Sequence, residues 1–294
     1  MLQFGFDIGG TNIAGGIVDD DANILVKAER RFPKGEGVVA VLNVLQDMFL
    51  GLCRELRISK YLIAAVGAAI PGSITFDGAS VIDAHNLDFH NVPFKAMLRQ
   101  RIDTPVYLQN DANAATLAEL VSGSLKGCKT AALLTLGTGV GGGLIINGRL
   151  FNGGRNMGVE LGHMLLKSGG EPCTCGNLGC VESYCSASSL CREYGTDSAK
   201  RVFEAAEAGD KRAQTVLDRY IDDLGSAIAS IVNLIDPERI ALGGGVSHAG
   251  DRLLAPLSEN VKKKCFFPSC PPIVRAHHGN DAGIIGAAMA HQYQ

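Results

Sequence analysis

One histidine and three cysteines between residues 160 and 182 have the types and spacing of metal ligands. His163 is followed by Cys173, Cys175 and Cys180 in the stretch ELGHMLLKSGGEPCTCGNLGCVE. One imidazole and three thiolates are a donor set for a closed tetrahedral zinc site, and the glycines allow a tight loop to fold back on a metal. The alternative is a group of small buried thiols in a glycine-rich turn. Because the three cysteines fall within eight positions, the sequence favours structural zinc.

Two glycine-rich turns have the residue types that hold phosphate. In the first, Gly9, Gly10 and Thr11 follow an apolar run that contains Asp7 near its end. Glycine lets backbone N–H groups point at an anion without a Cβ in the way, and threonine adds a hydroxyl donor. Asp7 could hold a magnesium ion there. Because Gly-Gly-Thr between strands is also common in plain turns, this motif alone leaves both interpretations open.

The second glycine-rich turn supports the first. GTGVGGGLII, which begins at Gly137, resembles GGTNIAGGIV, which begins at Gly9, and both segments follow an apolar strand. The similarity indicates an internal duplication, with two similar lobes that face each other across a cleft. It predicts a second phosphate turn at Gly137, Thr138 and Gly139. Chance similarity between short glycine-rich hairpins is the alternative.

A third glycine cluster, formed by Gly243, Gly244 and Gly245, also follows an expected strand. A nucleotide base or ribose could lie there against the start of the next helix. None of the three clusters has the GxxxxGK(S/T) spacing, so the sequence does not predict a P-loop.

Asp111 lies in the polar run QNDAN, where a strand is expected to become a helix. Aspartate and asparagine are good helix caps, which would explain the run without any function. The functional interpretation is that Asp111 projects from the carboxyl end of the strand as a general base. His277, His278 and Asp281 could be interpreted as a second metal set, but without a fourth ligand they fit surface histidines and a helix N-cap better.

The expected elements alternate between strands and helices, which predicts an α/β protein. Short apolar runs bounded by glycine or polar residues indicate strands, and apolar residues at every third or fourth position indicate helices. Strands are expected over Leu2–Ile8, Ile13–Val18, Leu62–Ala69, Val106–Gln109, Ala131–Leu136, Ile240–Leu242 and Ile273–Ala276. Helices are expected over Gly37–Leu56, Asp111–Ser122, Ser186–Glu193, Ser198–Ala208, Ala213–Leu234, Asp251–Lys264 and Asp281–Gln292.

Composition and charge restrict the class of protein. The 294 residues are 46% hydrophobic and 19% charged, which is typical of a globular chain and long enough for two closely joined domains. With a net charge of -3 and no long basic block, the sequence predicts no nucleic-acid partner. We find no apolar run of membrane-spanning length and no signal peptide, and the odd total of nine cysteines is a poor disulfide framework. A cytoplasmic protein without a membrane partner is therefore expected.

The motifs together resemble those of the ROK family of repressors, open reading frames and sugar kinases. DIGGT, HNL, QNDANAA, LGTGVGGG, ELGH, CTCGNLGCVE and GGGVS follow one another over essentially the whole chain. The cysteine stretch and the combination of ELGH with NDAN are the specific parts. The resemblance implies the two-lobed ribonuclease-H-like fold of the actin and hexokinase superfamily. The smaller lobe would contain residues 1–110 and 280–294, and the larger lobe residues 111–279 with the zinc-binding loop.

The resemblance also implies roles for individual residues. The family base falls on Asp111, in agreement with its expected place at a strand end. The implied sugar contacts are Asn86, Asn110, Asp111, Glu160, His163 and Glu182. The implied phosphate and nucleotide contacts are Gly9, Gly10, Thr11, Gly137, Thr138, Gly139, Gly243, Gly244 and Gly245. The implied zinc ligands are His163, Cys173, Cys175 and Cys180.

The implied function is that of an ATP-dependent hexose kinase, a phosphotransferase that uses Mg²⁺ and structural Zn²⁺. Asp111 would take the proton from the 6-hydroxyl of the sugar as this oxygen attacks the γ-phosphate. The loop HNLDFHNVPF, with Phe89, resembles that of members that phosphorylate glucose, so a glucokinase is expected. The family suggests a homodimer or homotetramer.

The sequence leaves two alternatives to a glucokinase open and argues against a third. Kinases for N-acetylmannosamine, N-acetylglucosamine, fructose and allose share nearly the same residue set. A sugar sensor that has lost catalysis is a second alternative, although Asp7, Asp111 and Thr138 are all present. A DNA-binding repressor is not expected, because the DIGGT turn begins too near Met1 to leave room for a helix-turn-helix.

Overall fold

A computed structural model describes residues 1–154 and 158–293 of the chain. Their contacts group them into two compact units. The first unit comprises Met1–Lys126, Arg149–Val159 and Asn280–Gln294, and the second comprises Gly127–Gly148 and Glu160–Gly279. This division differs from the expected boundary at residues 110 and 111, because the helix that begins at Asp111 packs on the C-terminal helix of the first unit.

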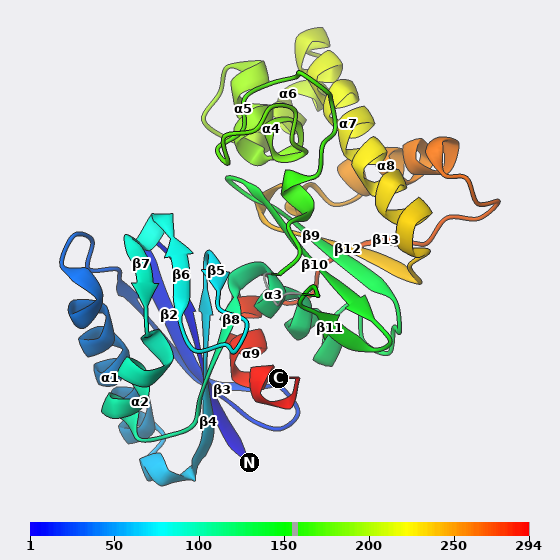
Figure 1. Cartoon of the computed structure of the whole chain (residues 1–294). Helices are drawn as coiled ribbons and strands as arrows, with labels where there is room; N and C mark the ends of the chain where they lie inside the picture. The colour runs from blue at the N-terminus through cyan, green and yellow to red at the C-terminus, as the bar shows by residue number, and fades with distance from the viewer. Residues whose placement is uncertain (155–157, 294) are drawn as a thin grey trace. The chain divides into compact units, whose positions relative to one another are not determined.

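The first unit is built on a five-stranded sheet (Figure 1). Its strands are β1 (Leu2–Ile8), β2 (Asn12–Val18), β3 (Ile24–Arg31), β4 (Ile63–Ile70) and β8 (Val106–Asn110). They lie in the order β3-β2-β1-β4-β8. β1 pairs antiparallel with β2 and parallel with β4, and β4 pairs parallel with β8. The parallel strands therefore end at one edge of the sheet, which is where Asp7 and Asn110 lie.

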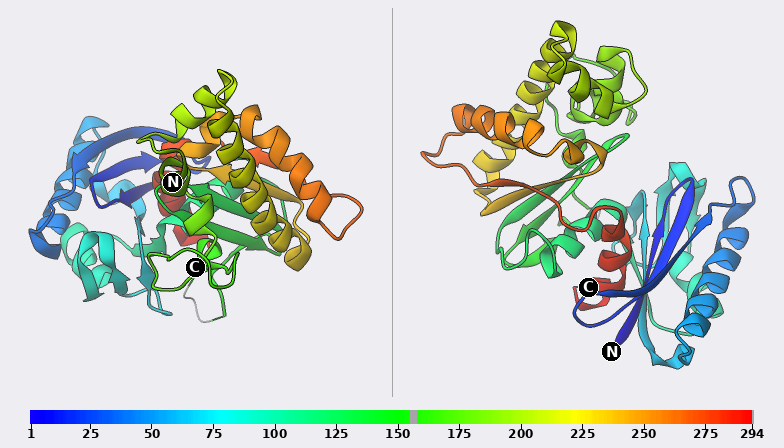
Figure 2. Two further views of the ribbon diagram at one scale, coloured as in Figure 1. Left: turned by 90° about the horizontal axis from the view of Figure 1, so that it is seen from above. Right: turned by 180° about the vertical axis from the view of Figure 1, so that it is seen from behind.

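Helices cover both faces of this sheet. α1 (Gly37–Glu55) and α2 (Phe94–Ile102) lie on one face, and α9 (Ala282–Met289) lies on the other, where α3 (Asp111–Val121) packs against it (Figures 1 and 2). The alternation of side chains along β1 explains this arrangement. Phe4 and Phe6 point toward α1, where Phe4 contacts Phe49, and Gly5 between them faces α9.

Among the described residues, α1 is the one helix that is long and apolar enough to cross a membrane by length and composition. This corrects the expectation that no apolar run reaches that length. Core helices of globular proteins pass the same test, and the buried residues of α1 belong to the core of the first unit. These residues are Val41, Leu42, Leu45, Met48, Phe49, Leu52 and Cys53.

α9 packs on β4 and on α3 through backbone atoms. A Cβ at Gly67 of β4 would overlap the carbonyl oxygen of Ala287. On another side of α9, a Cβ at Gly286 would overlap the carbonyl oxygen of Ala114 in α3. Because only glycine leaves room for such an approach, these two positions fix α9 directly on the sheet and on α3.

A smaller sheet in the first unit was not expected from the sequence. Its strands are only two to four residues long, too short for a clear periodic pattern. They lie in the order β5-β6-β7, and a single 3-10 turn, η2, separates the last two. The elements are β5 (Ser73–Ile74), β6 (Val81–Ala84), η2 (His85–Leu87) and β7 (Phe89–Val92).

The sheet of the second unit repeats the strand order of the first. The strands of this five-stranded sheet that belong to the second unit are β9 (Ala131–Leu136), β10 (Val140–Ile146), β12 (Arg239–Gly243) and β13 (Ile273–Arg275). β9 pairs antiparallel with β10 and parallel with β12, and β12 pairs parallel with β13. The order β10-β9-β12-β13 thus has the same directions as β2-β1-β4-β8, as an internal duplication predicts. β11 (Arg149–Phe151) follows β10 in the chain and contacts α3.

The helices of the second unit form a cluster around α7, the longest of them (Figure 1). α4, α5 and α6 contact α7 on one side, and α8 packs along it. The bounds are α4 (Glu182–Cys185), α5 (Ala187–Tyr194), α6 (Ala199–Glu207), α7 (Lys211–Ile235) and α8 (Asp251–Lys264). The helices expected after residue 186 are therefore present, with ends shifted by a few residues.

We predict that Gly67→Ala destabilises the protein by roughly 2–3 kcal/mol, because the added methyl group forces α9 away from β4. Gly51→Ala is the matched control. A Cβ at Gly51, inside α1, meets nothing within 4 Å, so this change should stabilise the helix by about 0.5–1 kcal/mol. Urea unfolding of both variants checks the prediction. Equal effects of the two changes would contradict the close packing of α9.

Candidate active site

Asn110 and Asp111 lie where β8 ends and α3 begins. Asn110 Oδ1 accepts hydrogen bonds from the backbone N–H groups of Ala112 at 3.0 Å and Asn113 at 3.1 Å, so Asn110 is the N-cap of α3. The cap interpretation is therefore correct for Asn110. Its Nδ2 also donates to the carbonyl oxygen of Gly72 at 3.2 Å. The exposed Asp111 side chain follows directly, and its Oδ1 accepts a hydrogen bond from the N–H of Ala112 at 2.8 Å.

Asp7 and Asp111 are two carboxyl groups with raised pKa values at the same edge of the sheet. Desolvation, followed by the charge of Asp111, raises the pKa of Asp7 from its usual 3.8 to about 6. Desolvation by the surrounding protein also raises the pKa of Asp111, against the hydrogen bond from Ala112. A Cβ at Gly283 would overlap the Asp7 carboxylate, so the start of α9 lies against Asp7. Two carboxylates that repel each other in this way suit a divalent cation or a bound proton.

The first glycine turn lies beside Asn86. The N–H of Gly9 donates to the carbonyl oxygen of Asn12 at 2.9 Å, which closes the turn between β1 and β2. A Cβ at Gly10 would lie 2.9 Å from the carbonyl oxygen of Asn86 in η2. Thr11 is exposed. The structure therefore brings Gly10, the phosphate candidate, and Asn86, the sugar candidate, into contact within the first unit.

The second glycine turn, at Gly137–Gly139, lies against α5. The N–H of Gly137 donates to the carbonyl oxygen of Gly139 at 3.0 Å. The hydroxyl of Ser188, in the first turn of α5, donates to the carbonyl oxygen of Thr138 at 2.8 Å. The turn is thus held by its own backbone and by the start of α5.

Glu182 connects the second glycine turn to the Cys-rich loop, which we define as residues 164–181. Its Oε2 accepts a hydrogen bond from the N–H of Val140 at 3.1 Å, directly after the turn, and a Cβ at Gly139 would overlap this oxygen. Its Oε1 accepts a hydrogen bond from the hydroxyl of Thr174 at 2.7 Å. Sequence analysis did not identify Thr174 as a functional residue, although its position between Cys173 and Cys175 places it inside the predicted zinc-binding loop.

Glu160 precedes the 3-10 helix η3 (Leu161–His163), which ends at His163 and packs on β10. A Cβ at Gly162 would overlap the carbonyl oxygen of Val140, so η3 lies on this strand at backbone distance. Glu160 is exposed at the start of η3, and His163 is half-buried at its end. The same strand therefore supports Glu160, His163 and the hydrogen bond to Glu182.

The four predicted metal ligands lie together. The donor atoms of His163, Cys173, Cys175 and Cys180 are all within 4.8 Å of one another. His163 Nδ1 is 3.5 Å from Cys173 Sγ, and Cys175 Sγ is 3.7 Å from Cys180 Sγ. A tetrahedral site with the bond lengths of zinc needs about 3.6 Å between nitrogen and sulfur and about 3.8 Å between two sulfurs. The donor set and these two spacings fit a four-coordinate metal ion.

Electrostatics within the cluster also suit a cation. Desolvation and the neighbouring thiols raise the pKa of Cys180 to about 12, whereas a backbone hydrogen bond from Asn177 lowers the pKa of Cys175. Several thiolates therefore do not coexist there without a compensating positive charge. Among the described residues, His277, His278 and Asp281 form no such group: the two histidine rings contact each other, and Asp281 pairs with Lys27.

The third glycine cluster borders a cavity of about 250 Å³ in the second unit. Gly244 has φ +76°, and a Cβ there would overlap Leu136, so the chain requires glycine at this point. Of the cluster, Gly245 lines the cavity. The other lining residues are Ala199, Lys200, Phe203, Val246, His248, Ala249 and Arg252. Small and apolar groups with three cationic or imidazole side chains are suited to a flat heterocycle that carries phosphate.

Each unit thus carries part of the predicted site. The residues Asp7, Gly9, Gly10, Thr11, Asn86, Asn110 and Asp111 belong to the first unit. The residues Gly137, Thr138, Gly139, Glu160, His163, Cys173, Cys175, Cys180, Glu182, Gly243, Gly244 and Gly245 belong to the second.

A family model and curated relatives match nearly the whole chain. A model of the ROK family matches residues 3–293. The glucokinase of Thermotoga maritima is 35% identical, over 98% of this chain and 96% of its own. The N-acetyl-D-glucosamine kinase of Citrobacter koseri is 31% identical, over 99% of both chains.

Solved structures are similar over the same extent. A ROK hexokinase from Thermus thermophilus has a TM-score of 0.88 and 33% identity, and the match covers 98% of this chain and 97% of that one. A ROK family glucokinase from Streptomyces griseus, in complex with glucose and AMPPNP, has a TM-score of 0.84 and 30% identity over 99% of both chains. The chain therefore has the α/β fold of the actin and hexokinase superfamily.

We predict that Asp7→Asn stabilises the protein at pH 7 when divalent metals are chelated. A carboxyl group whose folded pKa is raised favours the folded state below its unfolded pKa, and this contribution is lost as pH rises from about 4 through 6. Asparagine does not ionise, so the variant should be more stable by roughly 3 kcal/mol at pH 7 and equally stable at pH 4. Urea unfolding across this range checks the difference. A variant less stable than the wild type at pH 7 would contradict it.

Proposed function

The chain belongs to the ROK family and is an ATP-dependent sugar kinase, and we propose that it transfers the γ-phosphoryl group of ATP to the 6-hydroxyl of glucose. Relatives named glucokinase support the choice of sugar. The complex of the Streptomyces griseus glucokinase with glucose and AMPPNP supports ATP as the phosphoryl donor. The observation that carries the proposed mechanism is the exposed carboxylate of Asp111 at the end of β8.

Asp111 is the proposed general base. Its carboxylate is held at the start of α3 by the N–H of Ala112, and the Asn110 cap fixes the backbone on which it stands. Desolvation raises its pKa, which makes it a stronger proton acceptor than an ordinary aspartate. Asp111 would remove the proton of the 6-hydroxyl as the oxygen attacks phosphorus. The protein's remaining task is positioning, since phosphoryl transfer requires little covalent chemistry from it.

The two glycine turns are the proposed binding sites for the phosphates of ATP. Their N–H groups and the hydroxyls of Thr11 and Thr138 can donate to phosphate oxygens without interference from Cβ atoms. Mg²⁺, when bound, would neutralise charge on the phosphates, and the Asp7 carboxylate beside Asp111 fits such an ion. The cavity at Gly245 is the proposed site of the base.

We propose that His163, Cys173, Cys175 and Cys180 hold a structural zinc ion, which would lock the conformation of the Cys-rich loop. Thr174 lies between two of these ligands and donates to Glu182. A fixed loop therefore fixes the direction of the Glu182 carboxylate, which is a proposed sugar ligand together with Glu160, Asn86 and Asn110. Carboxylates suit a polyol because each can accept from two hydroxyls.

His163 can serve both the metal cluster and the sugar, because its two ring nitrogens are distinct. Nδ1 faces Cys173 at 3.5 Å. Nε2 then carries the proton and can donate a hydrogen bond to a sugar hydroxyl. One imidazole thus accounts for both roles that the family resemblance implies.

Three further properties belong to the proposal. None of the nine cysteines forms a disulfide, which supports a reducing cytoplasmic location. A homodimer or homotetramer is proposed from the family alone. A kinase for N-acetylglucosamine is the second candidate, because a relative with this name is 31% identical over 99% of the chain.

We predict that the wild type phosphorylates glucose with a higher kcat/KM than mannose, fructose, allose, N-acetylglucosamine or N-acetylmannosamine. We also predict that Asp111→Asn lowers kcat for glucose by about 10³-fold. The isosteric amide keeps the shape of the side chain and loses the base, so glucose binding should persist in calorimetry. A coupled ADP-release assay measures both. Asp103→Asn, at an exposed position with φ +57° that asparagine tolerates, is the matched control.

The outcomes of this panel separate the candidates. Highest kcat/KM with N-acetylglucosamine would replace glucose as the substrate, and binding without turnover of any sugar would favour a sensor. Near-normal turnover by Asp111→Asn would refute its role as the base.

We predict about one zinc ion per chain by metal analysis, and loss of this ion in Cys175→Ser. The freed loop should no longer hold Glu182, so the KM for sugar should rise by about tenfold while the KM for ATP changes little. Cys191→Ser, a half-buried thiol of α5 outside the cluster, is the control and should retain the metal. A metal-free protein with normal sugar affinity would show that the cluster has no structural role.

A further inference from the structure

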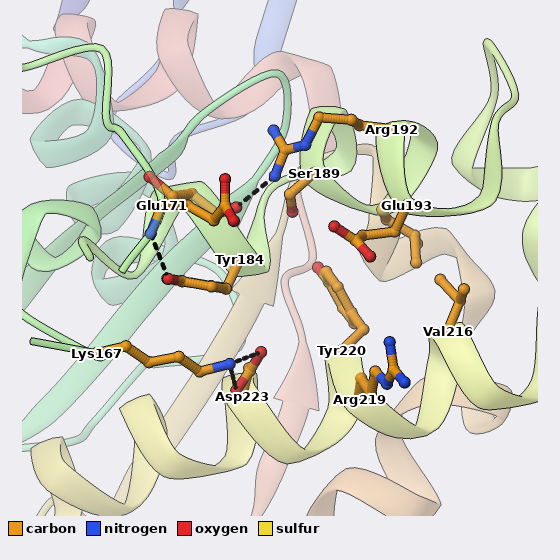
Figure 3. Close-up of a pocket in the computed structure, with 12 residues that line it drawn as sticks. Lys167, Glu171, Tyr184, Ser189, Arg192, Glu193, Val216, Arg219, Tyr220 and Asp223 are labelled. Carbon is orange, nitrogen blue, oxygen red and sulfur yellow. Dashed lines mark hydrogen bonds and ion pairs between the residues drawn. The ribbon is translucent and has the colours of Figure 1, made fainter. Parts of the chain in front are cut away.

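A cavity of about 170 Å³ lies behind the Cys-rich loop (Figure 3). Its walls come from the loop, α4, α5 and α7. The residues Lys167, Glu171, Ser183, Tyr184, Arg192 and Asp223 bring charged or polar groups to it. Polar contacts across this space join the loop to α4 and α7.

The strongest of these contacts joins Lys167 of the loop to Asp223 of α7. Lys167 Nζ lies 2.8 Å from both carboxylate oxygens of Asp223. The Asp223 side chain is only 15% exposed, whereas that of Lys167 is 47% exposed. The same Nζ lies 4.2 Å from the centroid of the Tyr184 ring, within the range of a cation–π contact. One ammonium group thus connects the loop, α4 and α7, as Figure 3 shows.

Tyr184 of α4 also contacts the Cys-rich loop directly. Its hydroxyl oxygen accepts a hydrogen bond from the backbone N–H of Glu171 at 2.6 Å. Next to Tyr184 in α4, the carbonyl oxygen of Ser183 accepts a hydrogen bond from the guanidinium of Arg192 at 3.0 Å. Lys167 thus joins Tyr184 and Asp223 on the cavity side of the loop, and we call these three residues the brace.

The brace is close in sequence to two proposed sugar ligands. Tyr184 follows Glu182 by two residues in α4, and Lys167 follows His163 by four residues. Within the loop, the N–H groups of Leu166 and Lys167 donate to the carbonyl oxygen of Gly179 at 2.8 and 3.1 Å. A shift of Lys167 would therefore also move the segment around Gly179, on the opposite side of the loop.

We propose that Lys167, Tyr184 and Asp223 are positioning residues for sugar binding: the brace anchors the Cys-rich loop to α7 and thereby sets the place of Glu182 and His163. The metal cluster fixes the loop internally, and the brace fixes the loop relative to the rest of the second unit. This inference rests on the proposed kinase function for its kinetic readout. A second readout below does not depend on activity.

Lys167→Met tests the proposal, because methionine keeps the length of the side chain and loses the charge. Removal of a partly exposed ion pair and a cation–π contact should raise the KM for sugar about fivefold, with kcat and the KM for ATP changed less than twofold. Asp223→Asn should have the same effect, and the double variant should be no worse than either single one. Lys167→Arg should restore sugar affinity.

Lys264→Met is the matched control. Lys264 Nζ pairs at 2.6 Å with Asp222, the neighbour of Asp223 on α7, but reaches it from α8 rather than from the loop. This variant loses a comparable ion pair of the same helix without touching the loop. Its KM for sugar should equal that of the wild type.

Hydrogen–deuterium exchange of the full-length protein supplies the activity-independent readout. Backbone amides of residues 166–181 should exchange several-fold faster in Lys167→Met and Asp223→Asn than in the wild type, and at the wild-type rate in Lys264→Met. Unchanged exchange in the two brace variants, or an equal increase in Lys264→Met, would overturn the proposal. Failure of the wild type to phosphorylate any hexose would instead refute the proposed function, and the exchange data would still decide on the brace.

Discussion

The approach of α9 to the sheet at backbone distance is the constraint on which the first unit depends. Gly67 in β4 and Gly286 in α9 leave no space for a Cβ, so the helix rests directly on β4 and α3. This contact sets where α9 begins, and its start at Gly283 lies against the carboxylate of Asp7. It also fixes α3, whose first residue is Asp111. One packing contact thus places both carboxylates of the proposed reaction, although the residues that form it have no chemistry of their own.

In the second unit, the carboxylate of Glu182 connects the elements that carry the proposed binding residues. Glu182 accepts hydrogen bonds from Val140, next to the second glycine turn, and from Thr174, between two of the candidate metal ligands. It therefore connects the proposed phosphate and sugar sites within one side chain. The proposed zinc site and the proposed brace would hold the same loop in two ways, one through a metal and one through the Lys167–Asp223 pair. Sugar recognition in this protein should depend on both.

The repeated topology explains why two glycine turns occur in one chain. In each unit an antiparallel hairpin carries the turn, and a parallel strand extends the sheet on the same side. The turns then differ in their surroundings: Gly10 meets Asn86, whereas Gly139 meets Glu182. A duplicated scaffold with different side chains is a direct route to two half-sites with different ligands.

The sequence by itself determined the α/β class, the glycine turns, the place of Asp111 at a strand end and the four candidate metal ligands of the cysteine cluster. These features depend on residues near one another in the chain, such as the three cysteines between 173 and 180, or on a periodic pattern that one strand or helix suffices to produce. The sequence missed β5, β6 and β7 because strands of two to four residues are too short for such a pattern, and it also missed the longer elements β3 and α2. Only the tertiary structure decided that Gly283 crowds Asp7, that Thr174 holds Glu182 and that Lys167 reaches Asp223. The partners in the first and last of these contacts are distant in sequence, and the geometry of all three is set by packing between elements, which no local pattern records.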